Sequence, residues 1–268
     1  DTIPFPKDNP YTPEKVALGK MLFFDTRLSR DKNLSCASCH SPSFGWEVPF
    51  DRAIGAGGKP LGRHAPTALN QAWSKNLFWD GRAPTLEAQA AGPIQAPVEM
   101  DLPLATAVTR LKAVQGYVSA FAKAFPKDGI TETTIVQAIA TFERTIVTGD
   151  TPFDRWVRGD AKALSAEAKR GFTLFTGKGN CAACHTGWNF TDDKFHDLGL
   201  PVAVRDARRL AVGCERLGAL EQAAGLQAVA ELQHPVVGIA ALRFGAPGPL
   251  VDGFEDEEHV RHGNGLPQ

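Results

Sequence analysis

Cys36-Ala37-Ser38-Cys39-His40 is the first of two copies of one five-residue pattern in this chain, and the second is Cys181-Ala182-Ala183-Cys184-His185. The chain has five Cys and seven His in 268 residues, and four of the Cys fall into these copies. C-x-x-C-H is the attachment pattern of a c-type haem, whose vinyl groups bond to the two thiols while the His ligates the iron. A redox dithiol needs no His, and a structural zinc site shows a tighter ligand cluster. The pattern therefore predicts two covalent haems, held by Cys36, Cys39, Cys181 and Cys184, with iron ligands His40 and His185.

Charge and hydropathy exclude several classes of partner. The formal net charge is −1 at pH 7, which favours neither nucleic acid nor an anionic membrane surface. No apolar run is long enough to span a membrane. Covalent haem is attached on the oxidising, outer side of a bacterial membrane, so we expect a periplasmic protein whose signal peptide has been removed. Cys214, outside both motifs, is expected to be a buried small hydrophobe.

Helical patterns precede both motifs. Thr12 is a candidate N-cap for a helix that starts at Pro13 and stops at Asp25. A second helix is expected between Ser165 and Gly177, just before the second motif. The apolar face of the first helix is predicted to consist of Val16, Leu18, Met21, Leu22 and Phe23.

The repeated order of helix, loop and haem motif indicates two cytochrome c-like units in a mainly α fold. Further helices are expected over residues 84–91, 104–114, 117–125 and 131–147. Residues 41–76 are expected to form a long ordered loop over the first haem. We predict a domain boundary at residues 149–152, which gives an N-terminal haem domain over 1–148 and a C-terminal one over 149–268.

The order of several short motifs around the two haem sites resembles the bacterial dihaem cytochrome c peroxidase and MauG superfamily. The resemblance covers roughly residues 12–200, and its second half resembles the MauG-like branch. The matching stretches are 28–30, 62–67, 78–83, 86–100, 187–192 and 195–199.

The resemblance implies roles for residues near the first, peroxide-reacting haem. Glu99 matches the acid/base carboxylate of its distal side, with a solvated loop carboxylate as the alternative. Gln89 and Pro93 match positions lining the same pocket, and Met100 is expected to contact the haem. Trp79 matches the Trp that lies between the two haems in the family and can carry electrons between them. The alternative is a core aromatic, and both descriptions can hold at once.

Two departures from the family bear on the first haem. Peroxidases of the family carry a loop His that ligates the first iron. Ungapped counting back from Trp79 puts Ala56 at this position. We therefore expect the first iron to keep an open coordination position and to need no reductive activation. His64 stands where the family commonly has an Asn that binds calcium. Imidazole is a poor ligand for Ca²⁺, so Ca²⁺ binding is doubtful and a structural hydrogen bond is expected instead.

The tail over residues 201–268 departs most from the family, because it holds no Met, Tyr, Trp or Thr. Met and Tyr are the residues that ligate the second haem in relatives, so neither is available from this tail. The remaining candidate ligands are His196, His234, His259 and His262.

The sequence therefore predicts a hydrogen-peroxide-dependent dihaem oxidoreductase with long-range electron transfer through the second haem. Its partner is either an electron-donor cytochrome c or cupredoxin, or a protein oxidised on Trp or Tyr, and the second is slightly favoured. The rival interpretation is a dihaem electron carrier without peroxidase activity, against which the segment from Gln89 to Met100 argues.

Overall fold

Helix α1 (Pro13–Phe24) begins and ends where its caps predict. Thr12 Oγ1 accepts the backbone N–H of Lys15 at 3.2 Å, which satisfies one of the free donors of the first turn. The helix buries a stripe centred on Leu18 and Leu22. Met21, predicted for the same face, is 46% exposed, because it lies about 100° round the helix from Leu22.

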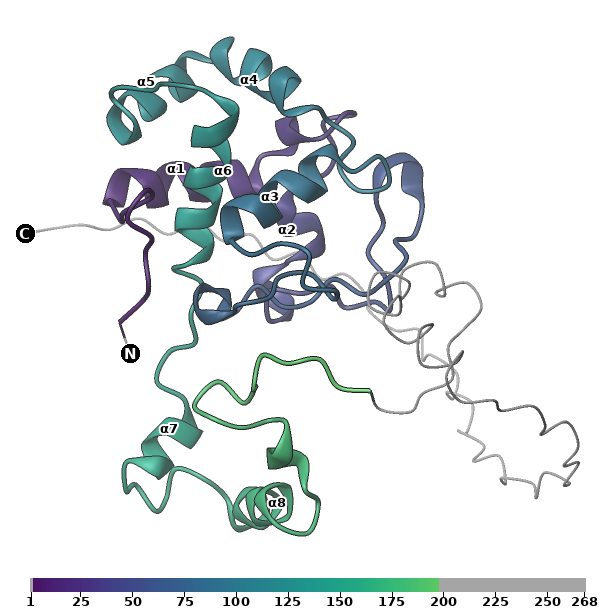
Figure 1. Cartoon of the computed structure of the whole chain (residues 1–268), viewed down its shortest axis with the longest axis vertical. Helices are drawn as coiled ribbons and strands as arrows, with labels where there is room; N and C mark the ends of the chain where they lie inside the picture. Colours follow the sequence, from purple (N-terminus) through teal and green to yellow (C-terminus); the bar gives the residue numbers. More distant parts are fainter. Residues whose placement is uncertain (1, 198–268) are drawn as a thin grey trace, which may run out of the picture. The chain divides into compact units, whose positions relative to one another are not determined.

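The structure, a computed structural model, describes residues 2–197, all within one unit that ends at Leu198 (Figure 1). In the described residues, β pairing is limited to isolated bridges between single residues. The prediction of a mainly α fold is therefore confirmed. None of its helices is long and apolar enough to cross a membrane. After α1 the helices are α2 (Cys36–Cys39), α3 (Leu86–Gln95), α4 (Leu104–Lys112), α5 (Gln115–Ala124), α6 (Glu132–Glu143), α7 (Pro152–Val157) and α8 (Ala166–Thr176).

Helix α3 runs past Gly92 and Pro93, beyond the predicted end at residue 91. The turn that follows α3 supplies partners for its last carbonyl groups. The Gly92 carbonyl accepts from Ala96 N–H at 2.9 Å, and the Pro93 carbonyl accepts from Met100 N–H at 3.0 Å. The helix therefore continues through residues that usually end one.

Helices α1 and α6 cross in direct backbone contact and form the centre of the core. The crossing occurs at Gly19, where an added Cβ would lie 1.9 Å from the Ala138 carbonyl oxygen and 2.7 Å from Phe142 Cβ. Only a residue without a side chain allows this approach. The Phe23 and Phe142 rings then pack edge to face beside it, with centroids 5.3 Å apart.

A buried polar network joins the N-terminal segment to α3 and α6. Arg144 binds Glu87 through two hydrogen bonds of 2.7 and 2.9 Å. Asn9 Nδ2 donates to the same carboxylate at 2.8 Å, and Lys15 Nζ donates to Asn9 Oδ1 at 3.1 Å. Each charged group in this network is hydrogen-bonded, as burial requires.

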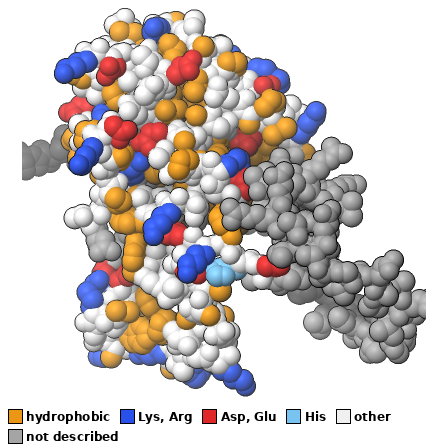
Figure 2. Space-filling view, viewed as in Figure 1, with side chains coloured by type: hydrophobic (Ala, Val, Ile, Leu, Met, Phe, Trp, Pro, Cys, Tyr) orange, Lys and Arg blue, Asp and Glu red, His pale blue; other side chains and the backbone are white. Residues whose placement is uncertain are grey.

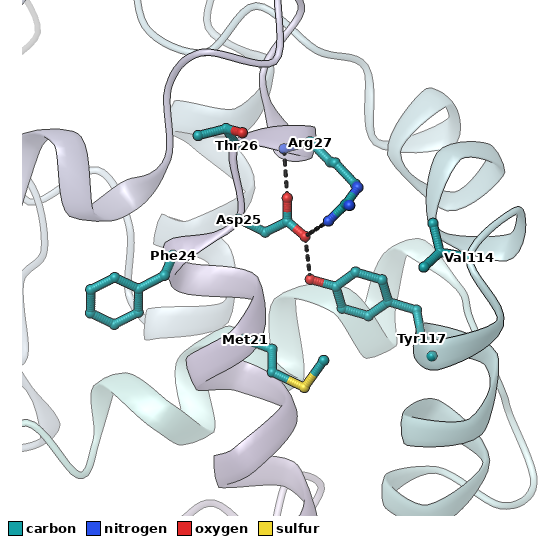
Figure 3. A pocket seen from close by; sticks show the side chains of 8 residues that line it. Met21, Phe24, Asp25, Thr26, Arg27, Val114 and Tyr117 are labelled. Atoms are coloured by element: carbon teal, nitrogen blue, oxygen red, sulfur yellow. Dashed lines mark hydrogen bonds and ion pairs between the residues drawn. The ribbon is translucent and has the colours of Figure 1, made fainter.

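Helix α5 is held to the end of α1 at a shallow surface pocket (Figure 3). Tyr117 donates its hydroxyl hydrogen to Asp25 Oδ2 at 2.5 Å. The same carboxylate accepts from the backbone N–H and the guanidinium of Arg27, at 2.8 and 2.7 Å. Met21 and Phe24 complete the wall of the pocket on the α1 side.

Residues 151–197 hold no buried side chain, in contrast to the first half of the described chain. Aromatic rings of α7, α8 and the loop after them pack on one another instead, and exposed apolar side chains gather there in Figure 2. Phe153 and Phe172 have centroids 5.2 Å apart, and Phe175 and Phe190 are 5.8 Å apart. Trp73 and Trp188, 4.8 Å apart, link this segment to residues before α3.

Candidate haem sites

The first motif forms the single turn α2, with His40 directly after it. Ser38 Oγ accepts the backbone N–H of Ser35 at 3.0 Å, which stabilises the start of the turn. Cys36 and Cys39 are three residues apart on one helical turn, so their thiols lie on the same side. The His40 N–H donates to the Cys36 carbonyl at 2.9 Å. The fold thus brings together the three groups that one c-type haem requires.

The His40 ring is oriented through its Nδ1 atom, which lies 3.3 Å from the Trp46 carbonyl oxygen. A carbonyl only accepts, so we assign the proton to Nδ1, and Nε2 keeps its lone pair. Burial lowers the pKa of His40, which favours the neutral ring. Metal-bound His usually donates its second N–H in this way, so His40 fits a haem iron on Nε2.

The second motif repeats this arrangement. Residues Cys181–Ala183 form a short 3₁₀ turn, and the His185 N–H donates to the Cys181 carbonyl at 2.9 Å. His185 Nδ1 lies 3.2 Å from the Phe190 carbonyl oxygen, which again leaves Nε2 for iron. Phe175 of α8 lies beside the imidazole, with centroids 6.4 Å apart. Both motifs therefore fit the haem chemistry predicted from the sequence.

Glu99 lies in a tight turn after α3, within electrostatic reach of the first motif. Its N–H donates to the Ala96 carbonyl at 2.9 Å. Burial, and then the charge of Glu99, raise the pKa of the Cys39 thiol to about 11. A carboxylate from a distant part of the sequence thus lies within electrostatic reach of one thiol of the first motif.

The loop that carries Ala56 packs directly on the Glu99 turn. The Ala56 N–H donates to the Glu99 carbonyl at 2.8 Å. At Gly55 an added Cβ would lie 1.9 Å from the Val98 carbonyl oxygen, so the two backbones touch. Ala56 itself is 9% exposed. Ala56, which the resemblance matches to the loop His of peroxidases, is thus a small buried residue that packs against the Glu99 turn.

The three other residues predicted for this pocket lie in α3 or the turn after it. Gln89 and Pro93 are half-buried on α3. Met100 is 5% exposed and belongs to the apolar core shared by α1 and α6. The Met100 side chain thus packs in that core, and its contact with a haem stays a prediction.

Trp79 is 55% exposed and does not belong to the buried apolar core of the described residues. Its indole N–H donates to the His64 carbonyl at 2.9 Å. The neighbouring residue Phe78 covers Gly92 of α3 and has the Arg82 guanidinium 3.5 Å above its ring. Trp79 thus lies on a fixed segment between the loop near the first motif and α3.

The histidines outside the motifs have partners of their own in the described part of the chain. His64 Nδ1 lies 3.0 Å from the Phe50 carbonyl oxygen and its Nε2 lies 3.4 Å from Glu47, so its predicted structural hydrogen bond is confirmed. His196 Nε2 is 2.8 Å from Asp192. The predictions for Cys214, His234, His259 and His262 lie outside the described residues.

Glu143, at the end of α6, is a buried acid that the sequence analysis missed. It is 9% exposed, and its Oε2 atom is buried without a hydrogen-bond partner among the described residues. The sequence pattern indicates its burial, because Glu143 follows Ile135 and Ile139 at intervals of four residues along the apolar stripe of α6. A charged residue on a buried stripe requires a partner or a function.

Comparisons with known proteins show the family to which this chain belongs. A family model described as di-haem cytochrome c peroxidase matches residues 13–162. The chain is 56% identical over 201 residues to the methylamine utilization protein MauG of Methylorubrum extorquens, covering 75% of this chain and 57% of that protein. It is 40% identical over 196 residues to cytochrome c551 peroxidase of Pseudomonas aeruginosa, covering 72% and 56%. The higher identity to MauG favours the MauG-like branch.

Solved structures support the same fold. A crystal structure of a MauG-like protein associated with microbial copper homeostasis is 33% identical, with a TM-score of 0.65, and the match covers 74% of this chain and 60% of that one. The diheme peroxidase BthA from Burkholderia thailandensis is 27% identical with a TM-score of 0.61, covering 69% and 54%. The chain therefore spans little more than half the length of the relatives it matches.

Proposed function

Because this chain belongs to the di-haem cytochrome c peroxidase family, whose members bind two haems, we propose that it is part of a peroxide-using oxidoreductase. A haem held by His40 would supply the iron at which hydrogen peroxide reacts. A haem held by His185 would supply the electron-transfer route to an electron-donor protein or to a Trp or Tyr side chain of a partner protein. The two-electron reduction of peroxide consumes two protons and yields two molecules of water.

Each haem would be held by its own C-x-x-C-H motif. Each Cys thiol would add across one vinyl double bond, forming a C–S bond while the thiol hydrogen goes to the other vinyl carbon. His40 and His185 would ligate iron through Nε2. When bound, the haem supplies the iron that binds peroxide and exchanges electrons. This attachment chemistry belongs to the oxidising compartment outside the cytoplasm, so we propose a periplasmic location.

Glu99 would act as the acid/base group of the first site. Its carboxylate takes a proton from the near oxygen of peroxide and returns it to the far oxygen, which leaves as water. The observation that carries the proposal is that one loop contacts both groups: Cys39 packs against the apolar cluster that contains Ala53, and the Ala56 N–H donates to the Glu99 carbonyl at 2.8 Å. It supports a carboxylate beside the first haem, whereas a plain electron carrier needs none.

Trp79 would carry electrons between the two sites, and Gln89 and Pro93 would shape the peroxide pocket. The half-exposed indole, fixed by its bond to the His64 carbonyl, supports this role. The Ala56 loop supports the MauG-like version, because Ala56 offers no imidazole to close the first iron.

The visible spectrum of the oxidised holoprotein, recorded with and without one equivalent of hydrogen peroxide, tests this proposal. We expect a high-spin component that changes on addition of peroxide, and two haems that stay attached in denaturing gels. Steady turnover with reduced cytochrome c would favour the peroxidase version over side-chain oxidation. A purely low-spin spectrum that peroxide leaves unchanged would favour the electron carrier and overturn the proposal.

A further inference from the structure

The carboxyl group of Glu143 stands out because Oε2 is the only side-chain oxygen or nitrogen of the described residues that is buried without a hydrogen bond. An unpaired buried atom of this kind destabilises the fold, so a natural protein rarely keeps one without a use. The residue ends α6, one position after the Phe142 ring of the core.

Cys36 of the first haem motif lies within electrostatic reach of this carboxyl group. Burial, and then the charge of Glu143, raise the pKa of the Cys36 thiol. Cys36 also packs against the core cluster that contains Phe142. The buried acid is therefore near the thiol that carries the first haem.

The neighbouring charged groups leave Glu143 without a dedicated counter-ion. Arg144 is engaged by both oxygens of Glu87, and Lys15 is engaged by Asn9 and the Pro10 carbonyl. Burial raises the pKa of Glu143 to about 8; Arg144 opposes this shift and the Glu87 carboxylate adds to it. Around pH 8 the protonated and ionised forms of Glu143 are therefore both populated.

We propose that Glu143 is the redox-linked proton site of the first haem, taking up one proton when that site accepts one electron. The proposal rests on the proposed attachment at Cys36. One electron comes from the electron-donor protein and one proton comes from solvent to a Glu143 carboxyl oxygen. The carboxylate becomes a neutral acid, so no net charge is added to the buried region. Electron transfer thereby avoids the desolvation penalty of an uncompensated charge.

The reduction potential of the first haem, measured between pH 6 and 9 in the holoprotein, tests this coupling. As the pH rises, Glu143 ionises in the oxidised protein, and reduction must then be accompanied by proton uptake at this residue. We therefore expect the reduction potential to fall with rising pH in this range. In Glu143→Gln, which keeps the shape but cannot ionise, we expect this slope to be lost. Glu132→Gln, an exposed acid on the same helix, should keep it. An equal slope in wild type and Glu143→Gln would overturn the proposal.

A wild-type measurement keeps the test decisive if Glu143→Gln does not fold. Above about pH 8, where Glu143 is ionised in the oxidised protein, the reduced-minus-oxidised infrared difference spectrum should show the carbonyl stretch of a protonated carboxylic acid, shifted in D₂O. Absence of that band refutes the proton uptake. The result is separable from the proposed function: a flat potential with intact peroxide reactivity overturns only this inference, and a pH-dependent potential without peroxide reactivity overturns only the function.

Discussion

The hydroxyl of Tyr117 illustrates how one residue can hold an element in place. Its bond to Asp25 is charge-assisted, and Tyr117 is 3% exposed. We expect Tyr117→Phe to lower the free energy of unfolding by about 1–2 kcal/mol at pH 7, since Asp25 keeps its bonds to Arg27. Urea denaturation measures this, and Tyr11→Phe, at a tyrosine that is 52% exposed, is the matched control.

The effect of Tyr117→Phe should depend on pH. Burial alone would raise the pKa of Asp25, but the hydrogen bonds from Tyr117 and Arg27 outweigh it and hold that pKa below its usual value. A carboxylate with a lowered pKa stabilises the fold above its unfolded pKa of about 4, and this stabilisation is lost as the pH falls. The difference between wild type and variant should therefore shrink below about pH 4. A constant difference from pH 7 to 3 would contradict this account.

Glu99 permits a test of the chemistry at a single residue. Glu99→Gln removes the proton-accepting oxygen but keeps the side-chain shape, so we expect the peroxide reaction to slow about 10²–10⁴-fold. Stopped-flow absorbance on the holoprotein measures the rate, and the mass should still include both haems. Glu14→Gln, at an exposed acid of α1, should react as wild type does. An unchanged rate in Glu99→Gln would remove this residue from the mechanism.

At the scale of elements, the crossing of α1 and α6 depends on Gly19. The Cβ of Ala at this position would meet the Ala138 carbonyl, and neither helix can shift without disturbing the core. We expect Gly19→Ala to destabilise the protein by about 3 kcal/mol or more, measured by thermal or chemical unfolding. Gly116→Ala in α5, where an added Cβ meets nothing within 4 Å, should be neutral or stabilising.

Local signals in the sequence predicted where helices begin, because caps act within one turn of the chain. Thr12, Ser165 and Thr131 cap their helices by accepting from the N–H three residues on. The crossing at Gly19 was not predictable in this way, because it depends on which helix packs opposite. The extension of α3 through Pro93 likewise depends on partners supplied by a later turn.

At the scale of the whole molecule, the two halves differ in how they are stabilised. The first has a continuous buried core, whereas residues 151–197 have an aromatic cluster with no buried member. We therefore expect Cys181→Ser with Cys184→Ser to accelerate hydrogen exchange in α8 strongly, and to leave α1 and α6 as protected as in wild type. Mass spectrometry of peptic peptides measures both. Equal acceleration in all three helices would show that the first half also depends on the second motif.

The site was predictable from the sequence only where motifs are contiguous. C-x-x-C-H is local, so the proximity of Cys36, Cys39 and His40 follows from one turn of chain. Glu99 was found through a family resemblance, since nothing in its own neighbourhood points to Cys39. Glu143 carried a signal in its place on an apolar stripe, but its neighbour Cys36 is more than a hundred positions away.

The contact between the Ala56 loop and the Glu99 turn also limits how this region can vary in evolution. An insertion near Gly55 would separate two backbones that touch, and would displace the carboxylate with them. The loop tip is different, because Gly57 and Gly58 adopt positive φ and face open space. Circular permutants or peptide tags placed at this tip should therefore keep the neighbouring turn intact.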